Sequence, residues 1–113
     1  MKYHINSYHE VIKGYNHSKI HIEASIDNVG DRGTTIKDIY LNKIIPEKYY
    51  PEKSEGERFE VKHIGPHNSE KWHIILRYDK KFIEEEKIEI ELEIRHTHGS
   101  KTLKTISNLV KQE

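Results

Sequence analysis

The segment KIEIELEIRH, residues 87–96, gives the clearest indication of the fold of this 113-residue chain. Isoleucine or leucine occupies every second position from Ile88 to Ile94, and glutamate fills the positions between them. Successive side chains of a β-strand point to opposite faces of its sheet. This alternation therefore predicts a strand with one buried face and one charged face.

Three further segments show the same alternation. They are KIHIEASI at 19–26, EKWHIILRYD at 70–79 and RFEVKHI at 58–64, where Phe59, Val61 and His63 are the residues in phase. Trp72 is in phase with the apolar residues of its segment, which predicts a place in the core. Two weaker strands are predicted from YHINSYHEVIKGY at 3–15 and SKTLKTISN at 100–108.

The segment TTIKDIYL, residues 34–41, interrupts its own alternation. Ile36 and Ile39 are three positions apart, and Leu41 comes two positions later. A β-bulge adds one residue to a strand and shifts the phase of the residues after it. A bulge near Lys37 or Asp38 would place all three apolar side chains on one face.

Loops rich in turn-forming residues, rather than helices, separate these strands. They cover residues 27–33, 46–57 and 65–70. Short strands recurring at intervals of roughly ten residues are typical of a β-sandwich. We therefore expect an all-β, single-domain protein over residues 1–113, with about seven antiparallel strands in two layers.

The segment IEASIDNVGDRGTTIKDIYL, residues 22–41, resembles a pattern common in immunoglobulin-like domains of bacteria, archaea and their viruses. In that pattern an alternating strand ends in Asn-x-Gly and is followed by Thr-Thr-Ile and an apolar Ile-x-Leu strand. The resemblance implies an immunoglobulin-like β-sandwich, without the cysteine pair of antibody domains, and implies little about function because such sandwiches host many roles. The matching residues are Asn28, Gly30, Thr34, Thr35, Ile36, Ile39 and Leu41.

Composition narrows the classes of function. Nineteen basic residues balance nineteen acidic ones, so no net charge attracts the chain to nucleic acid or to an anionic membrane. The absence of cysteine excludes disulfides and thiolate chemistry. No apolar run has the length of a membrane span or a signal peptide, so we expect a cytoplasmic protein. The excess of lysine, glutamate and isoleucine suggests a thermophile or an AT-rich genome.

Nine histidines raise the question of a metal site. His96 and His98 would project to the same face of a strand and share a zinc ion, with His63 or His73 as a third ligand. The segment lacks the acidic partners of familiar zinc motifs. We therefore favour a structural role for the pair, at the end of a strand and the start of a hairpin, and expect no cofactor.

Two hairpin registers are open for this segment. A two-residue turn at Gly99-Ser100 would place Arg95 opposite Lys104, which is mildly unfavourable. A three-residue loop with a glycine bulge would instead pair Ile94 with Ile106. We expect the bulged form.

Tyrosines in and beside the long connection after Leu41 suggest a contact surface. Tyr40, Tyr49 and Tyr50 lie near lysine and proline, a composition frequent in interfaces. An equal alternative is that Tyr49 and Tyr50 pack over the edge of the sandwich as a lid.

These observations favour a non-enzymatic binding or assembly module that acts through a loop or an edge strand, with a protein partner or a second copy of the chain. One alternative is a metal-binding protein or hydrolase that uses His96 and His98. Another is a nucleic-acid accessory protein, which the zero net charge disfavours.

Overall fold

The computed structural model describes residues 1–12, 17–50, 61–79 and 83–110. This part of the chain is all-β, as predicted: it forms seven strands and a single 3-10 turn, η1 (Glu47–Tyr49). The strands are β1 (Lys2–Ile12), β2 (His17–Asp27), β3 (Thr34–Ile45), β4 (Lys62–Ile64), β5 (Ser69–Asp79), β6 (Lys87–His96) and β7 (Gly99–Val110).

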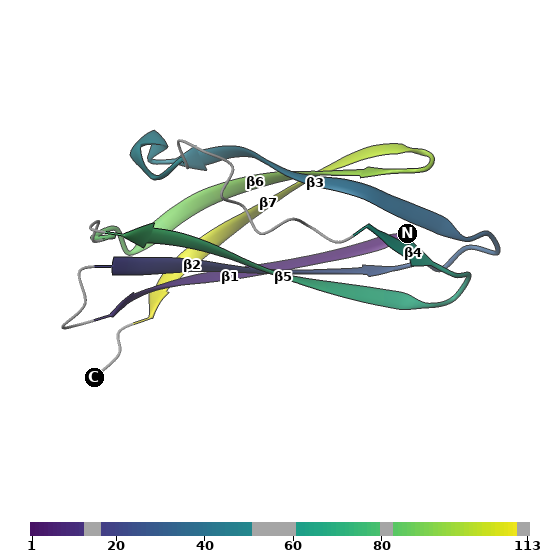
Figure 1. Ribbon diagram of the computed structural model, residues 1–113, viewed down its shortest axis with the longest axis horizontal. Helices are drawn as coiled ribbons and strands as arrows, with labels where there is room; N and C mark the ends of the chain where they lie inside the picture. The colour runs from purple at the N-terminus through teal and green to yellow at the C-terminus, as the bar shows by residue number, and fades with distance from the viewer. Residues whose placement is uncertain (13–16, 51–60, 80–82, 111–113) are drawn as a thin grey trace.

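The strands form one mixed sheet in the order β4-β3-β6-β7-β1-β2-β5. Every pairing is antiparallel except that of β1 with β7, which is parallel, so the expectation of a wholly antiparallel arrangement was wrong. The sheet curls until its two outermost strands approach each other, which gives a nearly barrel-shaped molecule (Figure 1). At this junction the Lys62 ammonium donates to the carbonyl of Lys71 at 2.8 Å and lies 5.2 Å from the centre of the Trp72 ring.

Strand β1 connects the two halves of the sheet. It pairs with β2 along its whole length, from Lys2 opposite Asp27 to Ile12 opposite His17. Its pairing with β7 covers only Tyr8–Glu10. In Figure 1, β7 accordingly crosses from the layer of β3 and β6 to the layer of β1, β2 and β5.

The interior contains the residues that the alternation selected. Every second residue from Ile20 to Ile26 and from Ile88 to Ile94 is at most 2 % exposed. Trp72 is 6 % exposed, which confirms its predicted place in the core. Since β-branched side chains pack well on a pleated surface, isoleucine can fill this core although apolar residues are only 34 % of the chain.

Strand β3 contains two bulges. Its register against β6 shifts between Ile36 and Asp38, which confirms the bulge predicted near Lys37 or Asp38. A second shift between Leu41 and Lys43 was not predicted, and it brings Ile44 onto the buried face.

The predicted phase of the fourth strand was wrong. Val61 is 65 % exposed, whereas Ile64 is 1 % exposed, and Phe59 lies outside the described residues. The reason is tertiary: Ile64 pairs with Thr34, which faces the core, so the pairing with β3 sets the phase of β4.

The hairpin between β6 and β7 adopts neither expected register. His96 pairs with Gly99, so the loop consists of Thr97 and His98. The Thr97 backbone N–H donates to the carbonyl of Thr35 at 3.1 Å, and this contact with β3 selects the turn. Gly99 has φ +137°, a conformation that residues with a β-carbon rarely adopt.

The Asn28 side chain organises the loop between β2 and β3. Its amide nitrogen donates to the carbonyls of Arg32 at 2.7 Å and Ile64 at 3.1 Å. Its oxygen accepts the backbone N–H of Gly30 at 3.1 Å. The Asn-x-Gly sequence therefore closes the loop and ties it to β4.

Candidate functional site

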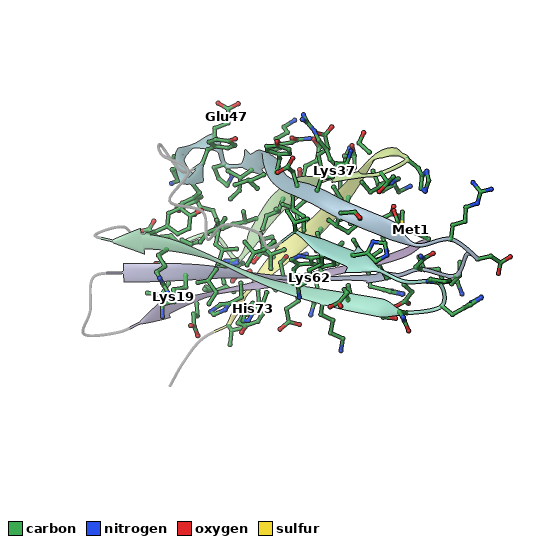
Figure 2. The ribbon with its side chains drawn as sticks, turned by 45° about the vertical axis from the view of Figure 1, so that its right-hand side comes forward. Met1, Lys19, Lys37, Glu47, Lys62 and His73 are labelled. Carbon is green, nitrogen blue, oxygen red and sulfur yellow. The ribbon has the colours of Figure 1, made fainter. Side chains whose placement is uncertain are left out.

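Two outer faces of the curled sheet present side chains to solvent. One belongs to β1, β2 and β5, and the other belongs to β3, β6 and β7. Figure 2 shows His73, on β5, and Lys37, on β3, on opposite sides of the molecule. Each face contains one arrangement with functional potential.

The first arrangement, here called the histidine cluster, consists of Tyr8, Glu10, His21 and His73. Tyr8 pairs directly with His21, and the two rings stack with centroids 4.5 Å apart and planes 10° apart. Glu10 and His73 occupy positions diagonal to His21 on the neighbouring strands, within reach of its ring.

Hydrogen bonds connect the cluster in a chain. The Nε2 atom of His21 lies 3.0 Å from Oε1 of Glu10, and its Nδ1 atom lies 3.1 Å from Nε2 of His73. Glu10 and His21 are largely shielded, with side-chain exposures of 16 % and 11 %, whereas His73 is exposed.

The carboxylate determines the direction of its own hydrogen bond with His21. An ionised carboxylate only accepts, so His21 donates from Nε2 to Glu10. When His21 is neutral, its Nδ1 atom is an acceptor, and His73 then donates to it from Nε2. In that state a neutral His73 carries its proton on Nε2 and a lone pair on Nδ1.

A groove of about 510 Å³ lies beside the histidine cluster and shares His73 with it. Its other polar lining residues are His4, Asn6, Glu23, Ser25 and Lys71. The histidine cluster therefore borders a groove that is open to solvent.

The second arrangement, here called the glutamate face, lies on the outer side of β3, β6 and β7. Paired residues on this face form rows that run across the three strands, and the strand register decides which residues share a row. One row is Ile45, Glu89 and Ile106, and the next is Lys43, Glu91 and Lys104. The rows border a groove of about 630 Å³.

Apolar side chains are unusually exposed on the glutamate face. Ile106 is 51 % exposed, Ile45 is 40 % exposed and Tyr40 is 40 % exposed. The guanidinium carbon of Arg95 lies 4.5 Å from the centre of the Tyr40 ring, and Lys104 lies 3.8 Å from Glu91. Exposed apolar groups that lie close together on a surface are one feature of interaction sites.

His96 and His98 lie at the β6–β7 hairpin, with ring centroids 6.3 Å apart. The Nδ1 atom of His96 accepts the backbone N–H of His98 at 3.2 Å. Partial burial and the neighbouring His98 lower the pKa of His96. Within the described ranges, no three or more histidine, aspartate or glutamate side chains are grouped so that they could hold a metal ion.

The two histidines considered as third ligands lie elsewhere. His63 on β4 contacts the Thr35 hydroxyl through Nδ1 at 3.0 Å, and His73 belongs to the opposite outer face. Among the described residues, the structure therefore does not bring together the ligand set that was considered as the alternative.

The three tyrosines predicted as a contact surface differ in exposure. Tyr49 is 2 % exposed; its hydroxyl donates to Glu85, and its backbone carbonyl accepts the Tyr78 hydroxyl at 2.7 Å. Tyr49 thus packs inside the molecule, while Tyr40 and Tyr50 remain on the surface. The Tyr50 hydroxyl donates to the carbonyl of Leu41 at 2.8 Å.

Glu85 lies at the centre of a charged group beside η1. The hydrogen bond from Tyr49 lowers the pKa of Glu85, and burial raises the pKa of Tyr49. Lys48 lies 3.0 Å from Glu85, and its hydrogen bond to that carboxylate raises the pKa of Lys48. These contacts fix the turn after β3 against the segment before β6.

Sequence reasoning missed the histidine cluster. The alternation places His21 on the outer face of its strand, where it is expected to be solvated. Only the pairing of β2 with both β1 and β5 surrounds it, so that it is 8 % exposed. A usable signal was the occurrence of histidine at outward positions in two strongly predicted strands.

No helix in the described part of the chain is long and apolar enough to cross a membrane. No protein-family model matches the chain, and a comparison with curated proteins finds no relative.

Proposed function

We propose that this chain is an immunoglobulin-like, non-enzymatic assembly module that pairs with a second copy of itself through the glutamate face. The observation that carries the proposal is the exposure of Ile45 and Ile106 on either side of Glu89. The β4 edge is a less favourable contact, since it has three residues and the Lys62 side chain is directed toward β5.

The topology supports the immunoglobulin-like part of the proposal. In such sandwiches the first, second and fifth strands share one sheet, and the third, sixth and seventh share the other. The groups β1-β2-β5 and β3-β6-β7 have the same division, although β4 pairs with β3 rather than joining the group of β1, β2 and β5. The bridging position of β1 joins the two groups into one curled sheet.

The register supports a two-fold pairing. If the symmetry axis runs parallel to the strands, between β6 and β7, then β6 of each copy faces β7 of the other. Glu91 of each copy then faces Lys104 of its partner, because these two residues pair in the same row. The contact repeats twice by symmetry and creates a ring of alternating charges.

Apolar burial supplies the remaining driving force. In the same arrangement Glu89 and Ile106 face each other across the interface, and the two Ile106 side chains come near the axis. Covering Ile106 removes apolar surface from water. Since the chain has a net charge of zero, two copies do not repel each other over long distances.

A charge-reversal series tests this pairing by light scattering over a dilution series. Lys104→Glu would place four carboxylates in the ring, so we expect its dimer to dissociate at least tenfold more readily than the wild type. The double variant Glu91→Lys/Lys104→Glu restores alternating charges and is expected to dimerise as the wild type does.

A matched control is Lys71→Glu, on the other outer face, which leaves the dimer unchanged. A monomeric wild type at all concentrations would reject the proposal. A double variant no better than Lys104→Glu alone would reject this geometry.

A further inference from the structure

We propose that the histidine cluster is a binding site for a late first-row divalent metal ion, with His21 and His73 as its two protein ligands. Glu10 positions His21 and does not bind the metal. This inference is independent of self-association, because the histidine cluster lies on the opposite outer face from Glu91 and Lys104.

The separation of the ligand atoms fits one ion. Zinc binds imidazole nitrogen at about 2.0–2.1 Å, so two nitrogens on a tetrahedral zinc ion lie about 3.4 Å apart. The Nδ1 atom of His21 and the Nε2 atom of His73 are 3.1 Å apart. The ion fits between them when the two rings move slightly apart and rotate so that both lone pairs point at it.

The protons of a neutral pair can be arranged so that both ligand atoms carry a lone pair. His21 keeps its proton on Nε2, donated to Glu10, so its Nδ1 lone pair is already available. His73 moves its proton from Nε2 to Nδ1, which frees the Nε2 lone pair for the metal. The neutral pair loses no proton, whereas a protonated pair would release one.

The surroundings of His21 match those of a metal ligand. Metal-binding histidines usually donate their second N–H to a carboxylate, which fixes the ring and raises its basicity. Glu10 occupies that position at 3.0 Å, and the stacked Tyr8 ring covers one face of the imidazole. The ring is therefore held in orientation before any ligand arrives.

The accessible side of the site belongs to His73. This residue is exposed and borders the 510 Å³ groove, so an ion can enter from there. Because no third protein ligand is grouped with the pair among the described residues, water or a group from another molecule completes the coordination. Imidazole nitrogen favours zinc, copper and nickel over magnesium and calcium.

Calorimetric titration with Zn²⁺ of protein lacking an affinity tag tests the site. We expect one saturable site in the wild type. His73→Ala should weaken it at least tenfold and Glu10→Gln by about 10–100-fold. His73 is exposed, so His73→Ala should fold normally, which circular dichroism verifies.

The matched control is the double variant His96→Ala/His98→Ala, which should bind Zn²⁺ as the wild type does. Nitrogen NMR of the imidazoles supplies a second measurement, in which Zn²⁺ should shift Nδ1 of His21 and Nε2 of His73. Absence of saturable binding, or unchanged affinity in His73→Ala, overturns the inference. Loss of binding in the control double variant instead assigns the zinc to the hairpin and overturns it equally.

Discussion

The interior of this protein has two regions of opposite character. Around the middle of β2 and β6 it is made of isoleucine, leucine and one alanine, at most 2 % exposed. Where β1 meets β7 it is polar: Ser7, His9 and Ser107 are at most 4 % exposed, and hydrogen bonds connect them to their neighbours. Lost side-chain volume is therefore expected to destabilise the first region, and a lost hydrogen-bond partner is expected to destabilise the second.

His9 illustrates how hydrogen bonds satisfy the buried polar groups of this region. It is fully buried, and its Nε2 atom donates to the carbonyl of Glu85 at 2.6 Å. In the neutral ring, which the lowered pKa of His9 favours, the Nδ1 atom accepts the hydroxyl of Ser107 at 2.7 Å. Burial lowers the pKa of His9, although the bond to the Glu85 carbonyl and the Glu85 charge partly oppose this effect.

The largest expected effect comes from the apolar region. Ile22→Ala removes a fully buried side chain and leaves a cavity between the layers, so we expect a loss of about 2–5 kcal/mol in the free energy of unfolding. Urea titration measures it. Val61→Ala, at a position 65 % exposed, is the control and should change the free energy by less than about 0.5 kcal/mol. Equal losses in both variants would contradict the described core.

An intermediate effect is expected in the polar region. His9→Leu leaves the Glu85 carbonyl and the Ser107 hydroxyl without their partner, at a cost of about 1–3 kcal/mol near neutral pH. The cost should shrink as pH falls. Because the folded-state pKa lies below the unfolded value of 6.5, the unfolded wild type takes up the proton first, and the His9 contribution diminishes below that pH.

Urea titrations of wild type and His9→Leu from pH 7.5 downward measure this difference. The lowered pKa of His96 acts in the same direction in both proteins and cancels in the comparison. A difference that is constant with pH would show that His9 does not carry the proton linkage.

The smallest expected effect is a gain in stability from a substitution at Thr34. Thr34 is 3 % exposed, and its hydroxyl has no hydrogen-bond partner among the described residues. Thr34→Val replaces the unpaired hydroxyl with a methyl group of similar size, so we expect a gain of about 1 kcal/mol. Thr102→Val on the exposed outer face is the control. A destabilised Thr34→Val would mean that the hydroxyl is hydrogen-bonded in solution.

The sequence by itself determined which side chains of the strongly alternating strands are buried, and it located the bulge near Lys37. Both result from local geometry, since a strand repeats every two residues whatever its neighbours are. The same local rule failed at Val61 and Ile64, because the three residues of β4 are too few to impose a phase against the pairing with β3.

Only the tertiary structure decided which strands meet. The parallel pairing of β1 with β7, the burial of Tyr49 against Glu85 and the contact of Glu10, His21 and His73 all join residues from separate strands or loops. An alternating pattern states that a face is buried without stating what covers it. The order of strands in the curled sheet determines what covers each face, and both candidate surfaces depend on that order.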